Sequence, residues 1–223
     1  MCGRFLEFSP LSTLINRFGL EENDLPELKP RYNIAPSQDV LAVVTGEGKN
    51  QLKEFHWGLV PSWARDAKIG YKMINARAET VAEKPAYRSA LIKRRCLIVT
   101  DYFYEWKREN GSKTPYFIHL DSNEPFGFGG LYERWVSAAG EIIDSCTIIT
   151  TSPNALMKSI HDRMPFIVPR EHEAMWLDRE VQDKTALTSL MCPYPAEQME
   201  AWPVSAQVNS PGHDSPDNIS RVA

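Results

Sequence analysis

Residues 96–120 read CLIVTDYFYEWKRENGSKTPYFIHL, and this stretch decides the predicted fold. It contains three runs rich in β-branched and aromatic residues, which are typical of strands. The runs cover residues 96–100, 103–107 and 116–120. Asn110-Gly111 lies between the last two runs, and this dipeptide favours the tight turn of a hairpin. The stretch therefore predicts consecutive strands with short, antiparallel connections.

Similar runs continue along most of the chain. Further strands are predicted at 40–45, 52–57, 126–132, 142–150 and 166–168, and short helices at 10–18, 85–93, 153–160, 170–177 and 184–191. Ser9 is the expected N-cap of the first helix, and Gly19 is expected to end it. Because the strands come in runs with few helices between them, we predict a single α+β domain with a curled, mostly antiparallel, barrel-like sheet and peripheral helices. This domain is expected over 1–209, followed by a flexible tail over 210–223 rich in Pro, Gly, Ser, Asp and Asn.

The composition indicates an ordinary globular protein. The 223 residues carry a net charge of −4, with 43% hydrophobic and 24% charged residues, which excludes disordered and low-complexity classes. No apolar run approaches the roughly 20 residues of a membrane helix, and no secretory signal is visible, so a cytoplasmic location without membrane contact is expected. Four widely spaced cysteines without a CxxC pair favour reduced thiols over a disulfide scaffold or zinc ribbon.

Several standard sites are missing from the sequence. Motifs for phosphate loops, zinc proteases and serine hydrolases do not occur, so neither a cofactor nor a metal site is expected. Gly127, Gly129 and Gly130 lie in a strand run, where glycine predicts a bulge or a close backbone approach. Cys96 and Cys146 lie in apolar strand runs and are expected in the core. The net charge argues against a protein that coats duplex DNA through bulk charge, but it permits a local basic cleft.

Cys2 has the most distinctive chemistry. If Met1 is removed, the chain begins with a 1,2-aminothiol whose α-amine has a reference pKa near 7.7–8, well below the value of about 10.4 for lysine. The amine can attack an aldehyde to give an imine, and the thiol can then close a five-membered thiazolidine ring in an intramolecular step. The alternative is that a cysteine follows the initiating methionine by chance.

Two further residues suit proton transfer. Glu105 lies in an aromatic, apolar strand run, where a partly desolvated carboxyl group has a raised pKa and can act as a general acid near neutrality. Strand alternation allows the opposite interpretation, in which Glu105 points to solvent. His161 precedes Asp162, which suits a proton carrier with a fixed tautomer, although an ordinary loop histidine gives the same pattern.

The segment around Asn75 and Arg77 suits ligand recognition. An Asn side chain donates and accepts hydrogen bonds at once, so Asn75 can hold an amine and a carbonyl together. Arg77 can clamp a phosphate through two parallel hydrogen bonds. The alternatives are an Asn turn and a surface ion pair between Arg77 and Glu79.

These pieces occur together in one order along the chain. The blocks are MCGRF at 1–5, RYNIAP at 31–36, WGLVPSW at 57–63, INARAET at 74–80, RCLI at 95–98, YEWK at 104–107, IHDRMP at 160–165, WPVS at 202–205 and VN at 208–209. The series closely resembles the SRAP (SOS response-associated peptidase) family of abasic-site processing proteins, over nearly the whole chain up to Asn209.

The resemblance implies a sensor and shield of abasic sites in single-stranded DNA. Its expected product is a covalent thiazolidine crosslink between Cys2 and the aldehyde of the ring-opened abasic sugar, and an abasic-site lyase activity is also expected. Carried over from the family, the catalytic residues are Cys2 as nucleophile, Asn75 to orient its amine, Glu105 to exchange protons with the sugar and the imine, and His161 for proton transfer and reversal. Carried over in the same way, the DNA-binding residues are Arg4, Arg77 and Arg163 on phosphates, with Trp63 and Pro36 beside displaced bases.

The resemblance also indicates where this chain is expected to differ from other family members. The family's peptidase label reflects a proposed self-processing that frees Cys2 where a propeptide precedes it, so this activity is expected to matter little in a chain with only Met1 before Cys2. Family members often carry glycine where this chain has Tyr102, and some carry a second aromatic where it has Ala64. Tyr102 is expected to narrow or restack the DNA face, and Ala64 to remove one stacking contact. A monomer is expected.

Three other functions remain open. Class II glutamine amidotransferases, which are amidohydrolases with an N-terminal nucleophile, also expose a cysteine after the initiating methionine, and glutaminase activity without DNA crosslinking would favour that reading. A non-covalent single-strand binding module would keep all its DNA binding after Cys2→Ala. A cysteine peptidase acting on other proteins would use Cys2, His161 and Asn75 as a triad-like set.

Overall fold

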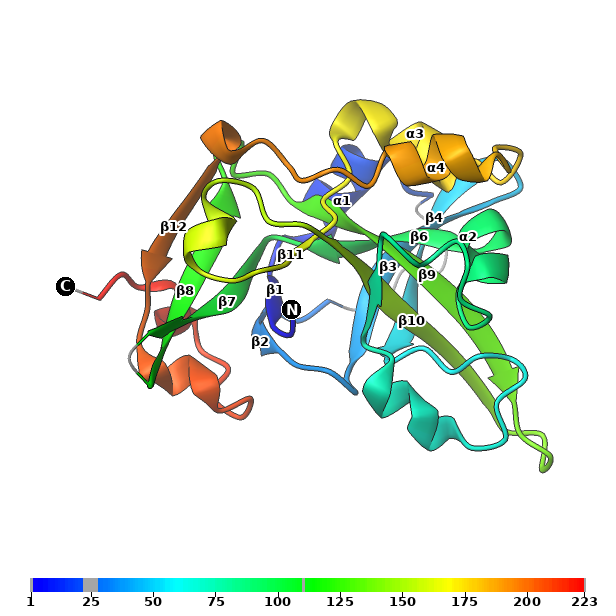
Figure 1. Cartoon of the computed structure of the whole chain (residues 1–223), viewed down its shortest axis with the longest axis horizontal. Helices are drawn as coiled ribbons and strands as arrows, with labels where there is room; N and C mark the ends of the chain where they lie inside the picture. Colours follow the sequence, from blue (N-terminus) through cyan, green and yellow to red (C-terminus); the bar gives the residue numbers. More distant parts are fainter. Residues whose placement is uncertain (1, 22–27, 110, 223) are drawn as a thin grey trace.

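The computed structural model describes residues 2–21, 28–109 and 111–222. Within them the larger sheet closes into a five-stranded barrel (Figure 1). In order around the barrel, the strands are β10 (Ile142–Thr151), β4 (Lys49–Trp57), β3 (Asp39–Gly46), β6 (Arg95–Thr100) and β9 (Phe126–Val136). Pairing of β9 with β10 closes the ring, in which the β10–β4 pair is parallel and the other pairs are antiparallel. The predicted barrel-like, mostly antiparallel sheet is confirmed.

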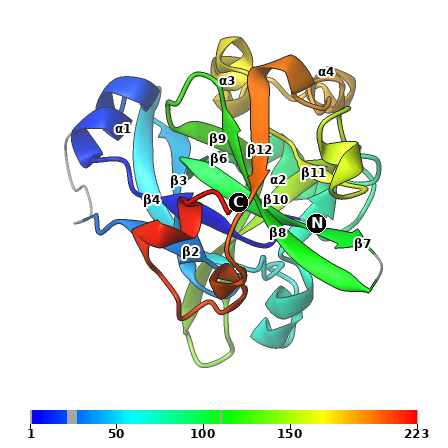
Figure 2. The same cartoon turned by 90° about the vertical axis from the view of Figure 1, so that its left-hand side faces the viewer.

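A second sheet of five strands lies beside the barrel and faces the viewer in Figure 2. Its antiparallel strands, in spatial order, are β12 (Met199–Pro203), β8 (Ser112–Leu120), β7 (Tyr102–Glu109), β1 (Phe5–Glu7) and β2 (Arg31–Ile34). Asp101 alone separates β6 from β7, so the chain passes directly from one sheet into the other. One buried cluster contains Phe5 and Phe103 from this sheet and Phe128 from the barrel, so the two sheets share a core.

Two short strands pair with β10 near its C-terminal end, in addition to the barrel strands β4 and β9. β5 (Asn75–Arg77) runs parallel to β10, with Asn75 opposite Ile148. β11 (Met164–Pro165) runs antiparallel to β10, with Pro165 opposite Thr150. Segments far apart in the sequence, one beginning at Asn75 and one following His161, therefore meet at the same end of β10.

The helices are short and peripheral. They are α1 (Leu11–Phe18), α2 (Arg88–Lys93), α3 (Arg170–Leu177) and α4 (Lys184–Ser189), with 3-10 turns η1 (Ala67–Lys72), η2 (Met157–Ser159), η3 (Ala196–Gln198), η4 (Ala206–Asn209) and η5 (Pro216–Ile219). Gly19 ends α1 in the left-handed conformation, with φ of 59°, as predicted. The α+β class is thus confirmed, with the helices placed outside the two sheets.

Small residues let β9 pack closely against β6. A Cβ atom added at Gly127 would lie 2.8 Å from Leu97 Cβ, and one added at Gly130 would lie 3.0 Å from Cys96 Sγ. The predicted close backbone approach is confirmed at Gly130, where the added Cβ would also lie 3.0 Å from the Thr147 carbonyl oxygen of β10. Cys96 and Cys146 are fully buried, also as predicted.

Three local predictions are wrong. The strand expected at 166–168 is β11, at Met164–Pro165. The helix expected at 153–160 is reduced to the single turn η2; the Asn154 side chain accepts from the Met157 N–H, a capping contact, so regular structure begins only after Asn154. Ser9 does not cap α1, since its hydroxyl donates to the buried carboxylate of Asp101 and Pro10 occupies the N-cap position.

The remaining predicted features are the hairpin tip at Asn110-Gly111 and the C-terminal tail. Asn110, at the predicted hairpin tip, lies outside the described residues, while Gly111 beside it has a φ of +78° and the flanking strands β7 and β8 form the expected antiparallel pair. Residues 210–222, expected in a flexible tail, lie against the five-stranded sheet: Trp202 Nε1 donates to the Ile219 carbonyl, and Asn218 is buried. The flexibility of this segment stays a prediction.

Candidate active site

Cys2 lies three residues before β1, at the start of the described chain. Its side chain is fully buried, in the same apolar cluster as Phe5 and Trp57. Burial raises the pKa of the Cys2 thiol far above its ordinary value, and the nearby charge of Glu105 raises it further. The thiol is therefore protonated at neutral pH in this arrangement.

Asn75 is held against Cys2 by the β5–β10 pairing. Its side-chain Nδ2 donates a hydrogen bond to the Cys2 carbonyl oxygen at 2.8 Å. Its Oδ1 is buried and has no hydrogen-bond partner among the described residues. An acceptor of this kind is costly to leave unsatisfied, so it is suited to a donor that arrives during function.

Glu105 points into the protein from β7. By strand alternation it shares a face with Phe103, and only 3% of the residue is exposed. Burial raises the pKa of Glu105 to about 7, and a hydrogen bond from the Trp106 N–H to Oε1, at 3.1 Å, opposes the shift. The desolvated alternative is therefore the correct one, and near neutrality this carboxyl group can both give and take a proton.

His161 lies between η2 and β11 with 23% of its side chain exposed. Its Nδ1 is 2.9 Å from Asp162 Oδ1 and accepts a hydrogen bond from the Arg163 N–H at 3.0 Å. In the neutral ring Nδ1 satisfies one of these partners at a time: it accepts from the Arg163 N–H when the proton is on Nε2, and it donates to Asp162 when the proton is on Nδ1. Partial burial lowers the pKa of His161, which favours this neutral form.

A cavity of about 300 Å³ brings Glu105 and His161 together beside the N-terminal segment. Its lining residues are Gly3, Arg4, Glu105, Trp106, Arg108, Lys113, His161 and Asn209. Cys2 precedes Gly3 in the chain but does not line the cavity. Of the four predicted catalytic residues, Glu105 and His161 thus line the cavity. Cys2 and Asn75 do not line it, but they are hydrogen-bonded to each other, and Cys2 is adjacent in the chain to the lining residue Gly3.

The three arginines predicted to bind phosphate differ in the hydrogen bonds and ion pairs that they already form within the protein. Arg4 donates to Asn33 Oδ1 and to the carbonyls of Val208 and Asn209. Arg163 donates to both carboxylate oxygens of Glu79 and to the Thr150 carbonyl. Glu79 therefore pairs with Arg163 and not with Arg77, whose exposed side chain has no hydrogen bond or ion pair to the described residues.

The predicted base-contacting residues lie outside this cavity. Trp63 is 59% exposed, an unusual state for tryptophan, and is available for stacking. Ala64, beside it, offers its carbonyl to Trp135 Nε1 at 2.7 Å. Tyr102 packs against Phe117 in the aromatic cluster of the five-stranded sheet, with ring centroids 4.7 Å apart, and does not line the cavity.

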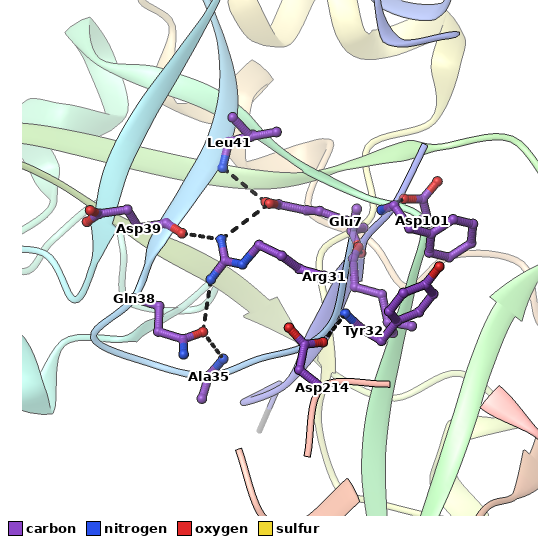
Figure 3. A network of polar contacts seen from close by, with 12 residues as sticks. Glu7, Arg31, Tyr32, Ala35, Gln38, Asp39, Leu41, Asp101 and Asp214 are labelled. Atoms are coloured by element: carbon purple, nitrogen blue, oxygen red, sulfur yellow. Dashed lines mark hydrogen bonds and ion pairs between the residues drawn. The ribbon is translucent and has the colours of Figure 1, made fainter. Parts of the chain in front are cut away.

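The loop that carries Pro36 is held by a polar network (Figure 3). Gln38 Oε1 accepts from the Ala35 N–H at 3.1 Å and from Arg31 Nη2 at 2.9 Å. The Arg31 guanidinium also reaches Glu7, with 3.6 Å between the nearest atoms. Burial raises the pKa of Glu7 to about 8. The network fixes the loop from Ala35 to Gln38 relative to β1.

The described residues contain neither a cluster that could hold a metal ion nor a helix that could span a membrane. No group of three or more His, Cys, Asp or Glu side chains is arranged to hold a metal ion among them. In the same residues, no helix is both long enough and apolar enough to cross a membrane.

Sequence reasoning missed Arg108 and Lys113 in the cavity wall. A signal for them was present, because the predicted Asn110-Gly111 turn places both on the hairpin that carries Glu105.

Comparisons with known proteins point in one direction. The family model described as SOS response associated peptidase (SRAP) matches residues 1–211. The abasic site processing protein YoqW of Bacillus subtilis (strain 168) is 50% identical over 222 residues, covering 98% of this chain and 99% of its own. The abasic site processing protein HMCES of Xenopus tropicalis is 30% identical, covering 90% and 69%. A solved structure of a Bacteroides thetaiotaomicron protein superposes with a TM-score of 0.89 at 27% identity, covering both chains fully.

Proposed function

The chain belongs to the SOS response associated peptidase (SRAP) family, and on that premise we propose that it senses abasic sites in single-stranded DNA and shields them by a covalent crosslink through Cys2. The observation that carries the proposal is the convergence of Cys2, Asn75, Glu105 and His161 from separate chain segments. Relatives named as abasic site processing proteins support the choice of substrate.

The reaction begins at an amine. After removal of Met1, the nitrogen of Cys2 is a free α-amine with a reference pKa near 7.7–8, so a useful fraction is unprotonated at neutral pH. It attacks C1′ of the ring-opened abasic sugar, and loss of water gives an imine. The Cys2 thiol then adds to the imine carbon, its proton passes to the nitrogen, and a thiazolidine forms.

The order of the two nucleophiles follows from burial. The raised pKa of the Cys2 thiol keeps thiolate scarce, so the amine attacks first. The thiol then adds to the imine carbon in an intramolecular step. Because the two groups are held close together, this step proceeds although little thiolate is present. The net product has the mass of protein plus DNA minus water.

Asn75 and Glu105 have complementary tasks in this scheme. Asn75 Nδ2 donates to the Cys2 carbonyl, and its Oδ1, which has no partner among the described residues, accepts a hydrogen bond from the α-amine and so aims the nitrogen lone pair at the sugar. Glu105, with a pKa of about 7, gives a proton to the opening sugar and to the departing water. His161, facing the same cavity, accepts or returns a proton during ring closure and reversal.

The DNA lies across the cavity mouth as a single strand bound by a monomer. Trp63 stacks on a base and Pro36 borders a displaced base, while Arg77 binds a phosphate and Arg4 and Arg163 line the path of the backbone. Elimination at the imine stage would cleave the strand, which is the lyase activity, and thiazolidine closure competes with it. The self-processing peptidase activity is a minor part of the proposal.

Intact-mass measurement tests the proposal. The purified protein is incubated with a single-stranded oligonucleotide that carries one abasic site, and the free protein in the same sample shows whether Met1 is absent. We expect an adduct of protein plus DNA minus water, and none with Cys2→Ala. Absence of the adduct in a chain that has lost Met1 contradicts the proposal.

A non-covalent single-strand binding module is the second candidate, because the Cys2 thiol is fully buried. That function requires unchanged DNA affinity in Cys2→Ala together with no adduct in the parent protein.

A further inference from the structure

Two positive charges face each other across the hairpin that carries Glu105. Arg108 on β7 is directly opposite Lys113 on β8. Side chains at opposite positions of an antiparallel pair have Cβ atoms roughly 4.5–5.5 Å apart, and like charges there destabilise the sheet. The pair is therefore unfavourable for folding unless something else is gained.

No carboxylate among the described residues lies within ion-pair distance of either cation. Neither side chain forms an ion pair or a hydrogen bond with a described residue. The nearby carboxylate of Glu109 is engaged by Lys107, 2.8 Å away. Lys113 Nζ lies 4.9 Å from the centre of the Trp106 ring, which itself has no charge to offset the ammonium.

Both cations line the cavity that holds Glu105 and His161. Burial raises the pKa of Glu105 and lowers the pKa of His161; the charge of Lys113 slightly opposes the first shift and the charge of Arg108 slightly adds to the second, so both cations act on the proposed proton-transfer groups. Arg4, the third cation of the cavity, already donates to three protein oxygens. Arg108 and Lys113 are thus the cavity cations that donate no hydrogen bond to the described residues.

We propose that Arg108 and Lys113 form an anion subsite that holds one backbone phosphate of the lesion-bearing strand next to the abasic sugar. The inference rests on the proposed function and names the contact that fixes the strand in the cavity. A guanidinium fork and an ammonium at opposite positions of one hairpin suit the oxygens of a single phosphodiester. The bound phosphate removes the repulsion across the hairpin, and it places C1′ of its sugar within the cavity.

The test uses a double variant and a matched control. Arg108→Gln with Lys113→Gln removes the subsite. Lys107→Gln with Lys49→Gln removes the same charge from one site on this hairpin and one remote site, each already paired with a carboxylate. Two single-stranded oligonucleotides are compared. One carries a tetrahydrofuran residue, which lacks the aldehyde and cannot crosslink, and the other carries a true abasic site.

We expect the subsite variant to bind the tetrahydrofuran strand about tenfold more weakly at low salt. Its plot of log affinity against log salt should be flatter by about 0.7, the contribution of one single-strand phosphate. Crosslinking of the abasic strand should be about tenfold slower at subsaturating protein and nearly unchanged at saturation. The control should stay within twofold throughout. Without DNA, the melting temperature of the subsite variant should equal or exceed that of the parent, because a repulsion is gone.

The outcomes separate the two proposals. Binding and salt slopes equal to those of the control overturn the subsite while leaving the crosslinking function in place. A lower melting temperature also overturns it, since the cations would then stabilise the hairpin itself. If the parent forms no adduct yet the subsite variant shows the flatter slope, the phosphate contact stands and the covalent function falls.

Discussion

Glu105→Gln is expected to make the protein more stable at alkaline pH while disabling its chemistry. The carboxyl group is almost fully buried, and its pKa of about 7 lies above the model value of 4.5. A raised carboxyl pKa means that the folded state binds more protons than the unfolded state between these two values. The free energy of unfolding of the parent therefore falls as pH rises from about 4.5 to about 7, and it is flat beyond.

The size of the effect follows from the shift. Each pKa unit corresponds to about 1.36 kcal/mol, so integration between pH 5 and pH 8 gives a loss of about 2–3 kcal/mol in the parent. Glutamine cannot ionise, and its Oε1 can keep the hydrogen bond from the Trp106 N–H. The variant should escape this loss. Any fixed cost of burying the amide cancels when the two pH values are compared.

Urea unfolding of parent and variant at pH 5 and pH 8 measures this difference. Glu197→Gln, at an exposed carboxylate on η3, is the control and should follow the parent at both pH values. A stability difference between Glu105→Gln and the parent that does not change with pH would refute the reasoning. In crosslinking, the variant should be roughly 10²-fold slower, and the fall in rate above pH 7 that comes from loss of the protonated acid should disappear.

Four further outcomes are expected. Cys2→Ala should abolish the adduct and leave affinity for tetrahydrofuran-containing DNA within twofold; a surviving adduct in the mass spectrum would contradict the assigned nucleophile. Asn75→Ala should slow adduct formation roughly 10-fold or more in single-turnover assays with little change in DNA affinity, because it orients the amine and not the strand. Trp63→Ala should weaken single-strand binding about tenfold in fluorescence anisotropy, since stacking contributes ~1–3 kcal/mol, and Ile142→Ala, a similarly exposed apolar change, should not. Arg77→Ala should flatten the salt dependence of binding by about 0.7, and an unchanged slope would rule out its phosphate contact.

Strand prediction from the sequence succeeded for the long strands, in which β-branched and aromatic residues recur over many positions. The barrel strands β3, β4, β6, β9 and β10 have six to eleven residues, long enough for β-branched and aromatic enrichment to be visible. Strands β1, β2, β5 and β12 have three to five residues and were not predicted. Such short segments become strands because a neighbour supplies their hydrogen bonds, and that neighbour lies far away in the sequence.

The site shows the same division. The blocks around Cys2, Asn75, Glu105 and His161 were sufficient for the family and for the choice of candidate residues. The burial of Cys2 was not visible, because it depends on two sheets closing over the residue. Nor was the engagement of Arg4 by Val208 and Asn209, which are about 200 residues away.

The sequence by itself determined the fold class, the barrel strands, the family and the residue types available for chemistry, because these depend on local patterns and on ordered motifs. The tertiary structure alone decided the protonation of Glu105, the partner of Asn75 and the cations that remain available in the cavity. Each of these depends on desolvation or on hydrogen-bond competition between segments remote in the chain, and neither quantity is a property of any one segment.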